Sequence, residues 1–142
     1  MLIGTILRNK GSDVTTVTPG ASVRELLAKL AERNIGAVVV STDGVTIEGI
    51  VSERDVVRRL DDRGAAILDQ PVSSIMTTEV RTAGPGENVD DLRRIMTVQR
   101  FRHMPVVENG RLIGIVSIGD VVKSAIEELE TEKASLVDYL HR

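Results

Sequence analysis

The stretch Gly-Ile-Val-Ser-Glu-Arg-Asp-Val-Val at residues 49–57 recurs as Gly-Ile-Val-Ser-Ile-Gly-Asp-Val-Val at residues 114–122. When the chain is shifted so that Pro19 lies over Pro85, the glycine after each proline and the apolar residues that follow also coincide. Internal similarity of this kind indicates a repeat architecture. The chain is therefore predicted to contain two copies of one structural unit.

Each copy is predicted to be a β-α-β-β-α unit. In the first copy, Pro19-Gly20 ends a short strand at residues 14–17, and Ser22 caps a helix with Glu25 completing a capping box. Apolar residues then recur at helical spacing up to Asn34. The later strands are expected at residues 37–40 and 47–51 of the first copy and at residues 104–107 and 112–116 of the second. In the second copy, Asn88 is expected to cap the helix, and residues 72–76 are expected to form a single turn.

This order of elements predicts a fold of the α/β class, of the α+β type. A copy of roughly 60 residues buries too little surface to be stable alone, so the two units are expected to pack together with pseudo-two-fold symmetry. The expected boundaries are residues 1–63 for the first repeat with its lead-in, 64–71 for a polar linker, 72–126 for the second repeat and 127–142 for a C-terminal helical extension.

The end of the chain shows a spacing close to heptads. The apolar residues concerned, interrupted by Lys133, are Val122, Ile126, Leu129, Leu136 and Leu140. A helix that caps its own domain and a homodimer contact both explain this spacing, and the sequence does not separate them.

Composition and charge exclude several classes of protein. The chain carries 18 Lys and Arg against 21 Asp and Glu, so it has no general positive field to attract nucleic acid or an anionic membrane surface. It has no Cys and only two His, which excludes disulfides and thiolate chemistry and argues against a metal centre. No apolar run approaches the ~20 residues that cross a bilayer. We expect a cytoplasmic protein with no nucleic-acid partner, no membrane partner and no metal site.

The repeated Ser-x-x-Asp pattern has two interpretations. Ser52 with Asp55, and Ser117 with Asp120, match a capping pattern in which side chains satisfy free backbone N–H groups at a helix start. A carboxylate in the first turn of a helix can also accept hydrogen bonds from both hydroxyls of a ribose. The nearby hydroxyl and N–H groups can hold a sugar or phosphate oxygen. We call the region around Ser52 and Asp55 the first cleft, and the region around Ser117 and Asp120 the second cleft.

A basic cluster, Arg100-Phe101-Arg102-His103, lies between the helix and the next strand of the second copy. Basic side chains at a helix end can simply complement the helix dipole. They also match a phosphate clamp, because Arg offers a planar pair of donors and His a pH-dependent donor. The first copy has Gly36 and Ala37 at the positions of Arg102 and His103, so it leaves room but supplies no charge for a phosphate.

Together these features resemble a cystathionine β-synthase (CBS) domain pair, also called a Bateman module. The resemblance rests on the tandem units, the two Gly-Ile-Val-Ser-x-x-Asp-Val-Val stretches, Val-Ser-Ser-Ile-Met-Thr at residues 72–77 and Arg-His-Met-Pro-Val-Val at residues 102–107. It covers the chain from about Ile3 to about Ile126, with no catalytic domain attached, as in stand-alone CBS-pair proteins. It implies a disc-like unit whose clefts bind AMP, ADP, ATP, NAD(H) or S-adenosylmethionine and so regulate a partner protein.

The resemblance also implies roles for individual residues. Asp55 and Asp120 would hold ribose hydroxyls, one in each cleft, and Arg102 and His103 would face phosphate in the second cleft. The other implied ligand-binding residues are Ser52 and Ser117 at ribose or phosphate, Thr5 near Asp120, Met76 and Thr77 near Asp55, Val51 and Val116 against the base, and Gly36, Ala37 and Gly119.

Because the first copy lacks counterparts of Arg102 and His103, we expect unequal clefts. The second cleft is expected to favour phosphorylated adenosine, and the first cleft to bind more weakly or to take a different ligand. Three arginines have two interpretations, namely Arg54, Arg58 and Arg59. They can supply positive charge to the first cleft, but we favour their interpretation as solvated helix residues, because arginines are seldom fully buried.

Two other functions compete with a nucleotide sensor. Ser117, His103 and Asp120 include the side-chain types of a hydrolase triad, but the Ser/Asp pair recurs in a copy without His. The sequence also has no Gly-x-Ser-x-Gly, P-loop or Gly-x-Gly-x-x-Gly motif. The second alternative is a ligand-independent dimeric interaction module. We expect a non-enzymatic homodimer with an adenosine nucleotide as regulatory ligand, no obligatory cofactor and an unidentified regulated partner.

Overall fold

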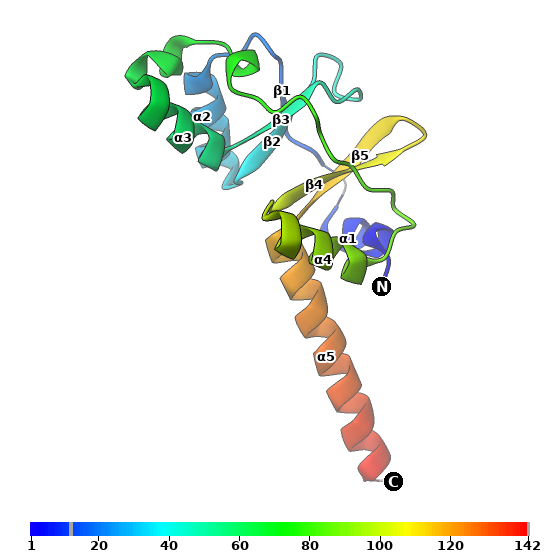
Figure 1. The fold of residues 1–142 in the computed structure, drawn as a ribbon. Helices are drawn as coiled ribbons and strands as arrows, with labels where there is room; N and C mark the ends of the chain where they lie inside the picture. The colour runs from blue at the N-terminus through cyan, green and yellow to red at the C-terminus, as the bar shows by residue number, and fades with distance from the viewer. Residues whose placement is uncertain (12, 142) are drawn as a thin grey trace.

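The computed structural model describes residues 1–11 and 13–141 and places the strands in two small sheets (Figure 1). The first sheet has the order β1 (Thr16–Val17), β2 (Ala37–Val40) and β3 (Gly49–Ser52), with β1 parallel and β3 antiparallel to β2. The second sheet pairs β4 (His103–Glu108) with β5 (Arg111–Ser117) in antiparallel fashion. Each repeat therefore builds its own sheet, and the α+β class is confirmed.

The helices follow the predicted order. They are α1 (Ile3–Lys10), α2 (Val23–Arg33), α3 (Glu53–Arg63), α4 (Val89–Gln99) and α5 (Ile118–Leu140), with two short 3₁₀ helices, η1 (Ala65–Asp69) and η2 (Val72–Ser74). The capping box of Ser22 and Glu25 is confirmed, and the Asn88 side chain accepts a hydrogen bond from the backbone N–H of Asp90. In the described part of the chain, no helix combines the length and the hydropathy needed to cross a membrane.

The second repeat departs from the predicted pattern at its first strand. Where the first repeat has β1, the second has only an isolated parallel bridge from Ala83 to Val106. The backbone N–H of Ala83 donates to the carbonyl of Pro105, and the carbonyl of Ala83 accepts from Val107. Ala83 takes the place of the β-branched Val17, and alanine has a lower strand propensity than valine. This difference accounts for the shorter pairing.

The segment expected to be a polar linker, residues 64–71, forms η1. Its Ile67 side chain is fully buried and belongs to the hydrophobic core of the first repeat. The polar residues around Ile67 concealed this single core position in the sequence. The segment is therefore part of the first repeat's packing and does more than connect the two repeats.

The two repeats exchange their lead-in segments. Ile3 and Ile6 of α1 are buried in the core formed by the second repeat, whereas Val72 and Ile75 are buried in the core formed by the first. Each lead-in segment thus completes the core of the opposite half, which ties the two halves together.

This exchange explains the glycine at the start of each repeated stretch. A Cβ atom built on Gly114 would lie 2.5 Å from Cδ2 of Leu7, and one built on Gly49 would lie 2.6 Å from Sδ of Met76. A Cβ atom at either position would therefore force these lead-in side chains to shift, because real Cβ atoms do not approach other atoms so closely.

The C-terminal helix α5 extends away from the rest of the molecule (Figure 1). Its first turns pack against the second repeat through the buried residues Val121 and Ser124. Every residue from Leu129 to His141 is exposed. The structure therefore contradicts the interpretation of the extension as a cap over its own domain.

Candidate functional site

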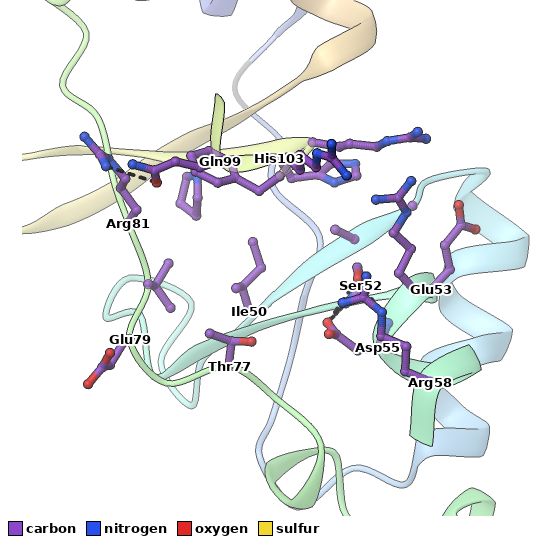
Figure 2. Close-up of a pocket in the computed structure, with 18 residues that line it drawn as sticks. Ile50, Ser52, Glu53, Asp55, Arg58, Thr77, Glu79, Arg81, Gln99 and His103 are labelled. Carbon is purple, nitrogen blue, oxygen red and sulfur yellow. Dashed lines mark hydrogen bonds between the residues drawn. The ribbon is translucent and has the colours of Figure 1, made fainter. Parts of the chain in front are cut away.

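A cavity of about 360 Å³ lies between the two repeats. Ser52 and Asp55, where β3 meets α3, form one wall, and residues 99–103, which run from the end of α4 to the first residue of β4, form the facing wall. Residues 77–81 close one side. Figure 2 shows Ser52 and Asp55 on the opposite side of this space from Gln99 and His103. The volume falls within the range of pockets that hold small organic ligands, ~300–1,000 Å³.

Ser52 and Asp55 form a capping box at the start of α3. The Asp55 carboxylate accepts hydrogen bonds through Oδ2 from the backbone N–H of Ser52 at 2.7 Å and from its hydroxyl at 3.0 Å. The backbone N–H of Asp55 donates to Ser52 Oγ at 3.3 Å. The capping interpretation is therefore confirmed. Because these bonds use Oδ2 alone, they leave Oδ1 of Asp55 to accept from a ligand.

The lining of the cavity carries an excess of positive charge. Five arginines and three carboxylates contribute to it: Arg54, Arg58, Arg81, Arg100, Arg102, Glu53, Asp55 and Glu79. Within residues 1–11 and 13–141, the guanidinium groups of Arg54, Arg58 and Arg102 form no hydrogen bond or ion pair. They are available to an anionic group, for which Arg is a strong donor.

His103 lies where the two repeats meet. A Cβ atom built on Gly36 would lie 3.3 Å from Cε1 of the His103 ring, so the small residue in the first repeat makes room for the imidazole in the second. Burial lowers the pKa of His103 below its ordinary value. The negative charges of Glu53 and Asp120 oppose this decrease in the pKa, and the positive charges of Lys10 and Arg102 add to it. The ring is therefore neutral at pH 7 and can accept or donate one hydrogen bond through each nitrogen.

The second cleft differs from the first because a lysine fills it. Nζ of Lys10 lies 2.6 Å from Oδ2 of Asp120 and donates a further hydrogen bond to the carbonyl of Ile115 at 2.9 Å. The same carboxylate accepts from the backbone N–H of Ser117 at 2.9 Å. The hollow that contains Lys10 and Asp120 has a volume of about 70 Å³, far below that of a nucleoside site.

The environment of Asp120 acts on its pKa in two directions. Burial tends to raise the pKa of this carboxyl, but the hydrogen bond and charge of Lys10, together with the N–H and hydroxyl of Ser117, outweigh it and lower the pKa. Asp120 is thus held as a carboxylate by groups of the protein itself.

Comparison with known families identifies the repeat. The model of the CBS domain matches the chain twice, at residues 7–62 and 72–127. The chain belongs to the CBS domain family. The family resemblance seen in the sequence is confirmed, and the two matches correspond to the two halves that enclose the cavity.

Solved structures of CBS proteins share this fold. A CBS-domain protein from Agrobacterium tumefaciens is 48% identical, with a TM-score of 0.85 over 88% of this chain and 99% of that one. A CBS-domain protein from Pyrobaculum aerophilum, complexed with AMP, is 26% identical, with a TM-score of 0.77 over 92% and 99% of the two chains. The CBS domain pair of protein MJ0100, complexed with 5′-methylthioadenosine and S-adenosyl-L-methionine, is 25% identical, with a TM-score of 0.78 over 90% and 98%.

The structure brings one group of the predicted residues together in the cavity between the CBS domains. They are Gly36, Ala37, Ser52, Asp55, Thr77, Arg102 and His103. Arg102 and His103, which we expect at phosphate in the second cleft, line the cavity of the first, although the charges of Asp120 and Lys10 also act on His103. The first cleft has the larger volume and the unpaired guanidinium groups.

Other predicted residues lie outside the cavity. Val51 and Val116 are fully buried in the two cores, and Met76 packs over Gly49. The hydroxyl of Thr5 accepts a hydrogen bond from Arg8, and the lead-in residue that contacts Asp120 is Lys10. The remaining three predicted ligand-binding residues lie at the start of α5: Ser117, Gly119 and Asp120. Gly119 faces a shallow outer groove.

The structure separates the three arginines of α3 that the sequence left open. Arg54 and Arg58 line the cavity, as their alternative role of supplying positive charge to the first cleft requires. Arg59 instead pairs with Asp62 at 2.6 Å, as a solvated helix residue. Helical spacing carries a signal for this difference, since Arg54 and Arg58 are four residues apart and so share a face with each other but not with Arg59. Nothing in the sequence pointed to Arg81, which donates to the side-chain oxygen of Gln99.

Proposed function

We propose that this CBS pair is a regulatory module that binds one adenosine-containing ligand in the cavity between its two domains. The observation that carries the proposal is the arrangement of Asp55 on one wall and the unpaired Arg102 on the facing wall, with Arg54 and Arg58 beside Asp55 on α3. An acceptor suited to sugar hydroxyls and donors suited to phosphate then share one space of about 360 Å³. The AMP and S-adenosylmethionine complexes of related CBS proteins support the same ligand class.

The ribose is proposed to bind at the start of α3. Oδ1 of Asp55 accepts from the vicinal hydroxyls, as acidic residues do in dinucleotide sites. The backbone of Thr77 is already paired with Ile50 through two hydrogen bonds of 2.9 Å, which fixes the neighbouring wall. The Thr77 hydroxyl is then positioned to contact the nucleoside. Ile50, Phe101 and Pro105 supply apolar surface for the base.

The phosphate is proposed to bind toward Arg102 and His103. Arg58 reaches the same space from α3, so the anion would be held by both domains at once. A ligand that contacts both domains favours one relative arrangement of them over others. Regulation would follow because a partner protein meets a surface that spans the two halves.

The test is a binding series on the full chain. Thermal unfolding and calorimetry with AMP, ADP, ATP, NAD, NADH and S-adenosylmethionine should show a stabilising ligand at one site per chain. A ligand at a hundredfold excess over its Kd adds ~2.7 kcal/mol to stability, a shift of several degrees. If none of these compounds shifts the transition, the proposal fails and the ligand-independent interaction module takes its place.

Variants locate the site. Asp55→Asn, which keeps an oxygen for the helix cap, should weaken binding by on the order of tenfold or more. Arg102→Ala should weaken binding of AMP but not of adenosine. Arg59→Ala and Asp120→Asn are the matched controls and should bind as the parent does. Loss of binding in Asp120→Asn together with normal binding in Asp55→Asn would instead place the ligand in the second cleft.

A further inference from the structure

The imidazole ring of His103 has no hydrogen-bond partner within residues 1–11 and 13–141, although the residue is only partly exposed. In this described part of the chain, no buried polar side-chain atom lacks a partner, so both ring nitrogens of His103 reach open space. That space is the cavity between the two CBS domains, where Figure 2 shows His103 across from Asp55. The ring is therefore left to bind a group that the chain does not supply.

Backbone hydrogen bonds fix the surroundings of this ring on both sides of the cavity. His103 is the first residue of β4 and lies opposite Ser117 of β5. In the first domain, a Cβ atom built on Gly36 would lie 3.4 Å from Nε2 of His103. The carbonyl of Gly36 accepts a hydrogen bond from the backbone N–H of Glu53 at 3.0 Å. Nε2 of His103 is thus held close to the first domain by a strand of the second.

Charged groups from four elements act on the ring. Glu53 at the start of α3 and Asp120 at the start of α5 favour its protonated form, whereas Lys10 at the end of α1 and the neighbouring Arg102 oppose it. Two charges of each sign offset one another, so burial decides and lowers the pKa of His103. The other charged groups that line the cavity are Arg54, Asp55, Arg58, Glu79, Arg81 and Arg100.

We infer that His103 takes up a proton from solution when the phosphate of an adenosine ligand binds in this cavity, so that phosphorylated adenosine binds more tightly as the pH falls. The inference rests on the proposed function, because it concerns the same ligand and the same cavity. A phosphate beside Arg102 offsets one of the two cations that oppose protonation of the ring and adds negative charge of its own. The imidazolium then donates a charge-assisted hydrogen bond to a phosphate oxygen.

This proton uptake makes His103 a specificity-determining residue. Adenosine has no phosphate and leaves the balance of charge around the ring unchanged, so its binding takes up no proton. The affinity for a phosphorylated ligand rises as the pH falls toward and below about 6.5, the ordinary pKa of a histidine. The rise ends once the ring is also protonated in the ligand-free protein, because the two states then carry the same number of protons.

Calorimetry of the full chain with AMP counts the protons. Titrations in two buffers that differ in their heat of ionisation give the number taken up per AMP bound. AMP carries a phosphate that itself titrates near pH ~6, so the comparison is with His103→Gln, in which that phosphate titrates as well. At pH 6 the natural chain should take up on the order of half a proton more than His103→Gln, and at pH 8 no more than the variant.

The same titrations measure the effect on affinity. Between pH 8 and pH 5, the affinity of the natural chain for AMP should increase on the order of tenfold relative to that of His103→Gln. His141→Gln, which changes the exposed histidine at the end of α5, is the matched control and should follow the natural chain. Equal proton counts and parallel affinity profiles for His103→Gln and the natural chain would overturn the inference and leave the proposed function standing.

NMR titration of the natural chain keeps the test independent of the folding of His103→Gln. The chain has only two histidines, so the spectrum of His141→Gln assigns both ring signals. AMP should move the titration midpoint of His103 to higher pH, and adenosine should not. An unmoved midpoint in the AMP complex would overturn the inference. Absence of AMP binding at every pH would overturn it too, whereas the proposed function fails only if the other five compounds also leave the unfolding transition unchanged.

Discussion

Nζ of Lys10 lies 2.6 Å from Oδ2 of Asp120, at the place that corresponds to the open cavity beside Asp55 in the opposite half of the molecule. Leu7 and Met76 occupy equivalent places over the two glycines of the repeated stretch, so Lys10 corresponds to Glu79. Glu79 lines the cavity that contains Asp55. Two carboxylates cannot form an ion pair, so the first cleft stays open, whereas Lys10 and Asp120 close the second.

The Lys10–Asp120 pair should make a modest, pH-dependent contribution to stability. Lys10→Met keeps the shape of the stem but removes the charge, and we expect a loss of about 1 kcal/mol at pH 7, because the pair is only partly shielded from water. The native pKa of Asp120 is lowered, so this contribution is present above the unfolded pKa of about 3.9 and is lost as the pH falls through the native value.

Urea unfolding of the natural chain and Lys10→Met from pH 7 to pH 2 measures this effect. The two curves of stability against pH should converge at the acid end, and NMR titration should show a higher pKa for Asp120 in the variant. A gap that persists at pH 2 would mean that lost packing, and not the ion pair, causes the difference.

His103 should make the folded state less stable in mild acid. Burial holds the pKa of His103 below its ordinary value, although Glu53 and Asp120 oppose this shift. As the pH falls below about 6.5, the unfolded chain takes up the proton first, so the free energy of unfolding decreases until the native pKa is reached. Urea unfolding between pH 8 and pH 5 should show this decrease.

The variant His103→Gln should have a smaller decrease over the same range. The matched control is His141→Gln, which changes an exposed histidine at the end of α5 and should leave the profile of the natural chain intact. Identical profiles for His103→Gln and the natural chain would contradict the assignment.

The two glycines beneath the lead-in side chains should differ in their tolerance of alanine. A Cβ atom on Gly49 would lie 2.9 Å from the backbone oxygen of Thr77, which cannot easily move because it accepts a hydrogen bond from Ile50. At Gly114 the obstacle is the flexible end of Leu7. We expect Gly49→Ala to cost about 3 kcal/mol and Gly114→Ala about 1 kcal/mol.

Gly20→Ala is the control for these two variants, since no atom lies within 4 Å of a Cβ built there. Thermal unfolding should rank the three proteins in the order Gly20→Ala, Gly114→Ala and Gly49→Ala, from most to least stable. The reverse order for the last two would show that the lead-in segment of the second repeat moves more easily than its hydrogen bonds suggest.

The short helix η1 should behave as part of the core. Ile67 is fully buried, so Ile67→Ala should destabilise the protein by about 2–5 kcal/mol. Asp69→Ala alters an exposed residue of the same helix and should change stability by no more than about 0.5 kcal/mol. Chemical unfolding of both variants checks this, and a small effect of Ile67→Ala would mean that the segment is a linker after all.

The sequence was sufficient for features that depend on local spacing. The two copies, the capping box at Ser22 and the helix starts at Ser52 and Ser117 follow from residues close together in the chain, where backbone hydrogen bonds are local. The family could be inferred for the same reason, because its motifs are contiguous. The burial of Ile67 could not, since one apolar residue in a polar segment has no periodicity.

By itself, the sequence determined that the chain is a tandem CBS pair with one acidic residue at the start of the second helix of each repeat. Only the tertiary structure decided which of the two acidic residues faces open space. That outcome depends on Lys10 meeting Asp120 across 110 positions of the chain, and on Arg102 lying opposite Asp55. Contacts between such distant residues depend on how the lead-in segments are exchanged between the repeats, and no local spacing records that exchange.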